Sequence, residues 1–149
     1  MTLLVPFDGS DLSRAALERA SEFAEYRDEE VVALTIVPDD EAFARERGWV
    51  DESERYDPER VCDEFEIAVD EIAPAATYRC EHPQPSDSMT ATVIDDITRT
   101  IRHVADDVDA SIVFIGSENA GRVSTPVTSV GSPVSEDPRY DVHIVRHAE

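Results

Sequence analysis

Glycine residues with polar neighbours follow an apolar segment in the last third of the chain. The run Ile112 to Ile115 stops at Gly116, Gly121 follows, and nine residues separate Gly121 from the pair Gly131-Ser132. Glycines after a strand let backbone N–H groups approach a phosphate, and a serine at a helix start adds a hydroxyl and an amide. This segment therefore predicts a phosphate-binding loop.

A second polar turn follows the first apolar run of the chain, where Leu3 to Phe7 ends at Asp8-Gly9-Ser10. The Asp8 carboxylate can accept a hydrogen bond from a ribose or an adenine. Asp8 and Asp11 together also allow phosphatase-type chemistry, but helix capping accounts for Asp11 and no lysine or second acidic cluster follows a matching strand. Because no nucleophile, base and orienting residue occur together, we predict no catalytic site.

The spacing from Gly116 to Gly121 also matches the G-x-x-x-x-G of a P-loop. Arg122 stands where that motif has lysine, and Val123 stands where it has a magnesium-binding serine or threonine. Without those two side chains the phosphate and metal contacts of a P-loop cannot form, so a P-loop NTPase is not favoured.

The hydrophobic pattern predicts alternating strands and helices that position these turns. Continuous apolar runs indicate strands, and apolar residues at a 3.6-residue period indicate helices. The expected strands are Leu3–Phe7, Val31–Val37, Ala75–Cys80, Ser111–Ile115 and Asp141–Val145, and the helical stripes run over Leu12–Ala24, Val61–Ile72 and Met89–Val104.

This order predicts an α/β fold, a five-stranded twisted parallel sheet with helices on both faces, Rossmann-like. Ligands on such sheets bind beyond the carboxyl ends of the strands, which selects the turns holding Asp8 and Gly116. The charged segment Asp39–Asp57 is expected to be a surface excursion with a short helix at Glu41–Arg47 and with Trp49 folded back onto the body.

The composition is strongly acidic, with 34 Asp and Glu against 13 basic residues and a net charge of −21. All the basic residues are arginine. We interpret this surface as adaptation to a high-salt cytoplasm, where screening shortens charge repulsion and high net charge maintains solubility. An acidic surface repels nucleic acids and anionic membranes, so neither is expected as a partner. The length of 149 residues predicts one domain, residues 1–149.

The cysteines and histidines show no spacing typical of a metal or redox motif. Cys62 and Cys80 are expected to be small buried residues, because two cysteines do not form a disulfide framework. His82 and His103 stand alone in the sequence, while His143 and His147 flank the end of the last strand, so no metal site is predicted. With no run of about 20 apolar residues and no leader, a cytoplasmic protein is expected.

Two of these motifs together resemble the universal stress protein family. The family pattern is a first strand ending in Asp-Gly-Ser, here Asp8-Gly9-Ser10, and a later G-x-x-G, nine residues, and Gly followed by Ser or Thr, here Gly121 and Gly131-Ser132. The resemblance covers essentially the whole chain. It implies the adenine nucleotide alpha hydrolase-like fold and a regulatory or stress-response module that binds an adenine nucleotide, ATP with or without Mg²⁺, and hydrolyses it slowly at most.

The resemblance also implies a nucleotide site and a homodimer. Pro6, Asp8 and Val37 would flank the adenine and ribose, and the residues lining the ribose and phosphates would be Gly116, Gly121, Gly131, Ser132 and Val134. The last strand, Asp141–Val145, would pair two copies of the chain.

Some residues depart from the family pattern. Glu118 replaces the first glycine of G-x-x-G, Pro133 removes an N–H donor, and Pro133–Tyr140 is short for the usual helix. The nearby cations are Arg122 and Arg139. An alternative is therefore a dimeric interaction protein of the same fold that does not bind nucleotide.

Overall fold

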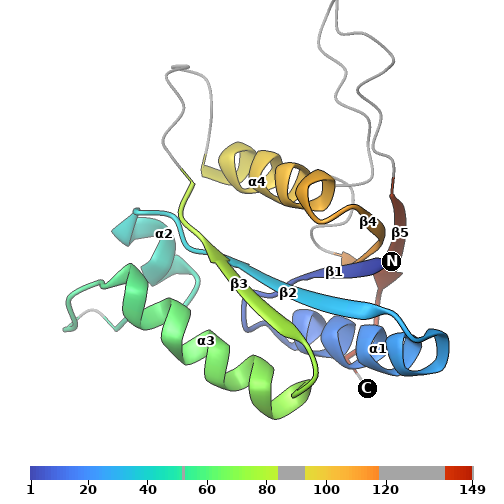
Figure 1. The fold of residues 1–149 in the computed structure, drawn as a ribbon. Helices are drawn as coiled ribbons and strands as arrows, with labels where there is room; N and C mark the ends of the chain where they lie inside the picture. The colour runs from blue at the N-terminus through green and yellow to red at the C-terminus, as the bar shows by residue number, and fades with distance from the viewer. Residues whose placement is uncertain (52, 84–92, 118–139, 149) are drawn as a thin grey trace, which may run out of the picture.

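Five parallel strands form a single twisted sheet in the computed structural model, which describes residues 1–51, 53–83, 93–117 and 140–148 (Figure 1). In spatial order the sheet runs β3-β2-β1-β4-β5. The strands are β1 (Thr2–Pro6), β2 (Glu30–Ile36), β3 (Thr77–Glu81), β4 (Ala110–Gly116) and β5 (Asp141–Val145). The predicted parallel α/β fold is thus confirmed.

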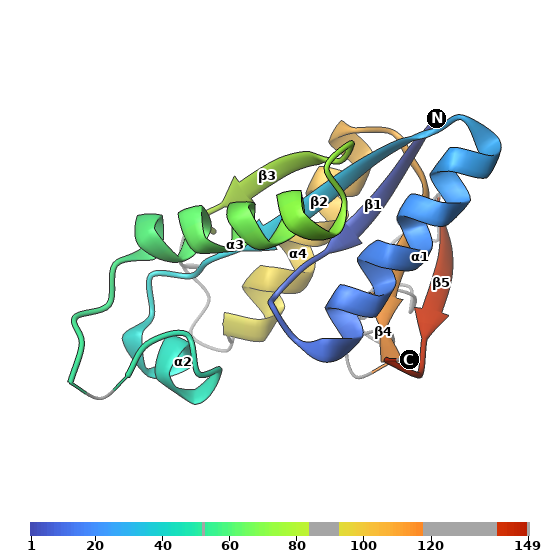
Figure 2. The same cartoon turned by 90° about the horizontal axis from the view of Figure 1, so that it is seen from below.

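Helices cover both faces of this sheet. Helices α1 (Asp11–Arg27) and α3 (Pro58–Ile72) lie on one face, and α4 (Val93–Asp107) lies on the other (Figures 1 and 2). The short α2 (Glu41–Glu46) stands beyond the carboxyl end of β2. The predicted helix from Met89 begins outside the described residues, and its described part starts at Val93.

Local sequence accounts for the starts of the long helices. Ser10 caps α1, because its hydroxyl accepts a hydrogen bond from the Ser13 N–H at 3.2 Å. Asp57 caps α3 in the same way, and Pro58 occupies the first turn, where a missing N–H costs nothing. Ser10 is thus the capping residue of α1, and Asp11, for which the sequence suggested helix capping, is the first residue of the helix.

The central strands separate two apolar layers. One layer packs α1 and α3 against the sheet and includes Leu3, Val5 and Phe7; the other packs α4 and includes Leu4, Leu34 and Val113. Because alternate residues of a strand face opposite sides, strands buried on both faces must be continuously apolar. This explains the mostly apolar runs of β1 and β2, in which the buried Thr35 of β2 satisfies its hydroxyl by donating to the Phe7 carbonyl at 3.0 Å.

The bounds of β5 are as predicted, and those of the other four strands differ from the sequence-based ones by one or two residues. Phe7 and Val37 lie just beyond β1 and β2, although each still donates its N–H to a neighbouring strand, Phe7 to Leu34 O at 2.7 Å and Val37 to Glu81 O at 2.9 Å. Among the described residues, no helix is both long enough and apolar enough to span a membrane.

Candidate functional site

A pocket of about 470 Å³ opens at the carboxyl end of β1. Its walls come from three parts of the chain: residues 8–10 of the β1–α1 turn together with Arg14 of α1, residues 46–49 at the end of α2, and the side of α3 that carries Val61, Glu64 and Phe65. The volume lies in the range of small-molecule sites, and its place matches the rule that ligands bind beyond the strand ends.

Three acidic residues line this pocket, Asp8, Glu46 and Glu64, and both carboxylate oxygens of Asp8 have partners. Oδ1 accepts the Ser10 N–H at 3.0 Å, which fixes the tight turn into α1. Oδ2 forms an ion pair with the Arg47 guanidinium at 3.1 Å, with the Asp8 side chain 25% exposed. The turn therefore orients Asp8, while a cation from another segment neutralises it.

Trp49 closes one side of the pocket. Its indole N–H donates to the Asp8 carbonyl at 3.3 Å, and its ring meets the edges of Phe43 and Phe65 with centroids 5.6 and 5.5 Å away. The prediction that Trp49 folds back onto the body is confirmed. The excursion, Asp39–Asp57, thus contributes a wall of the site.

Two glycines at the strand ends are required by close packing. Gly9 has φ +82°, and a Cβ there would lie 2.7 Å from Phe65 Cε1. A Cβ on Gly116 would lie 2.8 Å from Leu12 Cβ, at the start of α1. Gly116 therefore has a structural reason in this chain, independent of any ligand, because helix and strand approach too closely for a side chain.

Pro6 and Val37, the other two predicted site residues in the described chain, sit at the same edge of the sheet. Pro6 ends β1 opposite Leu34 of β2. Val37 is fully buried, and its carbonyl accepts a hydrogen bond from His82 Nδ1 at 3.0 Å. Since its N–H is also paired, Val37 can offer a ligand only the second lone pair of its carbonyl.

The remaining predicted site residues, Gly121, Gly131, Ser132 and Val134, lie outside the described residues. The same holds for Glu118, Pro133 and the two arginines Arg122 and Arg139. The structure thus brings Pro6, Asp8, Val37 and Gly116 to one edge of the sheet and leaves the predicted phosphate loop unplaced.

The model of the universal stress protein family matches residues 1–146. The chain belongs to the universal stress protein family. A search of curated proteins gives no match.

Solved structures of other universal stress proteins have the same fold. The protein from Lactobacillus plantarum is 17% identical with a TM-score of 0.58, and the alignment covers 98% of this chain and 97% of that one. A universal stress protein in complex with cAMP is 22% identical with a TM-score of 0.52, covering 100% and 98%. The Archaeoglobus fulgidus protein in complex with dAMP is 17% identical with a TM-score of 0.56, covering 98% of each chain.

Two arginines at the site of this universal stress protein were missed by sequence reasoning. Arg47 pairs with Asp8, and Arg14 lines the same pocket, donating from Nε to the Gly9 carbonyl at 3.3 Å. Sequence spacing gave no indication of Arg47, which lies 39 residues from Asp8. The sequence offers one indirect hint of its role, because Arg47 lies two residues before the single tryptophan in the charged excursion.

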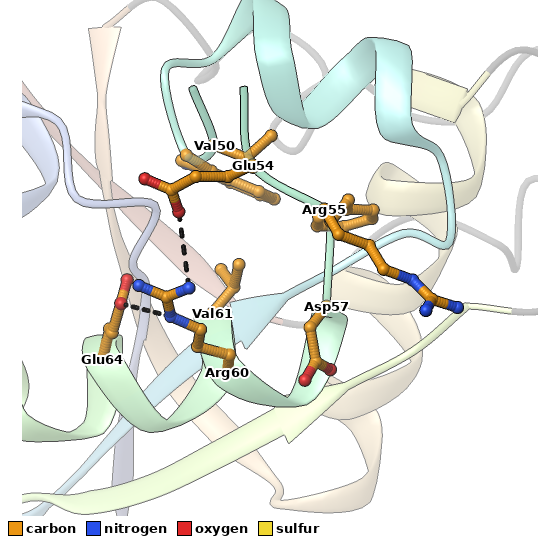
Figure 3. Close-up of a pocket in the computed structure, with 9 residues that line it drawn as sticks. Val50, Glu54, Arg55, Asp57, Arg60, Val61 and Glu64 are labelled. Carbon is orange, nitrogen blue, oxygen red and sulfur yellow. Dashed lines mark hydrogen bonds and ion pairs between the residues drawn. The ribbon is translucent and has the colours of Figure 1, made fainter. Parts of the chain in front are cut away.

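A much smaller hollow adjoins the pocket between residues 49, 50 and 54–57 and helix α3 (Figure 3). Arg60 lies at its edge and binds Glu54 and Glu64 at 3.4 and 3.2 Å. Its cavity volume of about 20 Å³ would hold roughly one water molecule, so it offers no room for a ligand.

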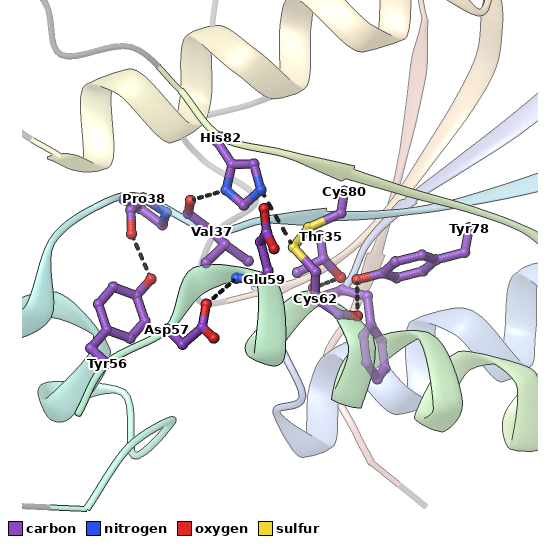
Figure 4. Close-up of a disulfide and its surroundings, with 11 residues drawn as sticks. Thr35, Val37, Pro38, Tyr56, Asp57, Glu59, Cys62, Tyr78, Cys80 and His82 are labelled. Carbon is purple, nitrogen blue, oxygen red and sulfur yellow. Dashed lines mark hydrogen bonds between the residues drawn. A yellow bond between two sulfur atoms is a disulfide. The ribbon is translucent and has the colours of Figure 1, made fainter. Parts of the chain in front are cut away.

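The expectation of two separate buried cysteines is wrong. In this universal stress protein Cys62 on α3 and Cys80 on β3 form a disulfide with their Cα atoms 6.1 Å apart (Figure 4). Nor does His82 stand alone, since its Nε2 lies 3.8 Å from Cys62 Sγ. Sequence reasoning missed the pair because packing α3 on the sheet, not a sequence motif, brings positions 62 and 80 together.

Proposed function

We propose that this universal stress protein binds an adenine nucleotide, ATP with or without Mg²⁺, at the β1 pocket, and that the bound nucleotide biases its interaction with a partner. The observation that carries the proposal is the oriented Asp8 carboxylate in a pocket of about 470 Å³ at the sheet edge. Family membership and the adenine nucleotides named for two relatives support it.

The described residues suit the adenine and the ribose of such a ligand. The Asp8 carboxylate can accept ribose hydroxyl hydrogen bonds, and the aromatic side chains Trp49 and Phe65 give an apolar wall. Gly121, Gly131, Ser132 and Val134 remain our proposed phosphate-lining residues, with Gly116 at the base of their loop. No residue is assigned a catalytic role, so hydrolysis would be slow.

Arg47, one of the two arginines that line the pocket, is our proposed phosphate contact. In the free chain the Arg47 guanidinium is paired with Asp8. When a nucleotide binds, ribose hydroxyls would replace the guanidinium as the partner of Asp8. The guanidinium would then bind the triphosphate. Guanidinium groups bind phosphate through paired, charge-assisted hydrogen bonds. The exchange leaves neither charge without a partner.

Substituting Arg47 tests this exchange. We expect Arg47→Ala to weaken ATP binding roughly tenfold, the effect of one charge-assisted hydrogen bond of about 1.4 kcal/mol, and to leave adenosine binding nearly unchanged. The measurement is calorimetric titration of both ligands at one fixed salt concentration. Arg45→Ala is the matched control, because Arg45 is an exposed arginine of α2 that pairs with Glu41 and does not line the pocket. Equal losses for ATP and adenosine would contradict the phosphate role.

A second candidate function is a dimeric interaction protein of the same fold. The observation that favours it is β5, which pairs with β4 and stands at the end of the sheet order with its other edge unpaired among the described residues. Unpaired edges are templates for joining strands of another chain. In this reading two copies pair through Asp141–Val145.

Proline substitution tests the pairing through β5. Successive backbone N–H groups point to opposite sides of a strand, so one of Val142→Pro and His143→Pro removes an N–H from the free edge and the other removes one from the β4 ladder. We expect the variant that lacks the N–H on the free edge to be a folded monomer by light scattering, whereas the parent chain is a dimer. A parent chain that is already monomeric at micromolar concentration would refute this model.

The acidic composition leads to a proposal about the environment in which the protein works. We infer a cytoplasm of high salt as the working environment, on the basis of the −21 charge and the absence of lysine.

A further inference from the structure

Three potential metal ligands lie together near the carboxyl end of β3, next to Val37 and outside the β1 pocket. Cys62 Sγ, Cys80 Sγ and a ring nitrogen of His82 all lie within 4.8 Å of one another. They come from α3, from β3 and from the residue after β3's last position, and Figure 4 shows the three side chains converging. We propose that, once the disulfide is reduced, the two thiolates and the imidazole bind Zn²⁺, with the fourth position open to solvent.

The spacing of the three ligand atoms is close to what zinc needs. Tetrahedral Zn²⁺ with bonds of about 2.3 Å to sulfur and 2.0 Å to nitrogen places its ligand atoms about 3.6 to 3.8 Å apart. Cys62 Sγ and His82 Nε2 are already 3.8 Å apart. The two sulfurs must separate by roughly 1.7 Å from their bonded distance.

The orientation of His82 also fits a metal ligand. Its Nδ1 lies 3.0 Å from the Val37 carbonyl, which can only accept, so Nδ1 carries the proton and donates it. This leaves Nε2 with its lone pair directed at the sulfurs. Metal-binding histidines typically make the same hydrogen bond with the nitrogen that does not bind the metal.

Contacts other than the disulfide also hold the cluster together. The Tyr78 hydroxyl donates to the Cys62 carbonyl at 3.0 Å, linking α3 to β3 at the same place. Val37 and Val61 pack around Cys62 as well. The exposed His82 and the partly buried Cys80 give an incoming ion access.

The chemistry balances with a dithiol as the reductant. The reductant's two thiols pass two electrons and two protons to the Cys62–Cys80 bond, forming two cysteine thiols and one disulfide in the reductant. Zn²⁺ binding then releases the two thiol protons, because the thiolate is the metal ligand. Disulfide and zinc are therefore mutually exclusive states of one site.

The test uses the full chain, reduced with a dithiol and freed of it without oxygen. Zn²⁺ is titrated in molar KCl against a chromophoric chelator, and Co²⁺ serves as the spectroscopic probe. We expect one Zn²⁺ per reduced chain, a thiolate-to-cobalt charge-transfer band, and no binding by the oxidised chain. Cys62→Ser should lose the band and weaken binding at least tenfold.

His82→Ala keeps the proposal testable if a cysteine variant fails to fold. We expect it to weaken Zn²⁺ binding at least tenfold, whereas His103→Ala, which removes another exposed histidine on α4, should leave binding unchanged. Zinc binding that is equal in the reduced and oxidised chains, or a reduced chain that binds none, would overturn the site. Neither result would bear on nucleotide binding, because none of the three ligands lines the β1 pocket.

Discussion

Lowering KCl from about 2 M to about 0.1 M is expected to reduce the free energy of unfolding by a few kcal/mol, because the screening length grows from below 3 Å to about 10 Å. At low salt, the −21 charge acts across the compact surface, and folding brings these charges closer together. The ion pairs in the described residues offset little of this, since exposed pairs contribute about 1 kcal/mol or less each.

Urea unfolding is the suitable measurement, since urea adds no ionic strength, and the fluorescence of the single tryptophan, Trp49, reports it. A triple variant provides the control: Glu18, Glu22 and Glu25, three exposed residues of α1, changed to Gln. These residues repel one another at three- and four-residue spacing, so the variant should gain stability at low salt and little at high salt. Equal stability of the parent chain in both salts would contradict the high-salt interpretation.

Reducing the Cys62–Cys80 disulfide is expected to lower the free energy of unfolding by about 3 kcal/mol. The bond closes a loop over a sequence separation of 18, and cross-linking a loop of this length restricts the unfolded chain by about that amount. It also joins α3 to the edge strand β3, which has only β2 as a neighbour in the sheet order. We therefore expect α3 and β3 to be destabilised most when the disulfide is reduced.

The comparison is between urea midpoints with and without a dithiol reductant in molar KCl. The variant with both cysteines changed to Ser is the control, and the reductant should not change its midpoint. If the parent chain unfolds at the same urea concentration with and without reductant, the bond contributes nothing to stability. Adding Zn²⁺ to the reduced parent should restore part of the loss, because a ligand that binds only the folded state stabilises it.

Sequence patterns predicted the fold well because each signal was local. The β-branched run of β2 and the apolar stripe of α1 each depend on neighbours within a few residues. The parallel sheet then follows from the alternation of strands and helices. Errors were confined to strand ends, where residues such as Val37 keep one ladder hydrogen bond beyond the strand.

Only part of the candidate site could be predicted from the sequence. Asp8 could be selected because it follows a strand in a tight turn. Arg47 and Trp49 could not, because their contacts with Asp8 span 39 and 41 residues and depend on how the excursion folds back. The Cys62–Cys80 pair was missed for the same reason. Gly116 was interpreted as a ligand-approach glycine, whereas the described structure gives it a packing role against Leu12.

The most direct test of the central proposal is calorimetric titration of ATP into the wild-type chain and the Asp8→Asn variant in molar KCl. We expect one site per wild-type chain that saturates below millimolar ATP, and affinity roughly 30-fold weaker in Asp8→Asn, the loss of about 2 kcal/mol for hydrogen bonds to a charged group. Asp11→Asn removes the same charge from the exposed first turn of α1 and should bind ATP like the wild type. No heat from the wild-type chain up to millimolar ATP, with and without Mg²⁺, would contradict nucleotide binding at this pocket.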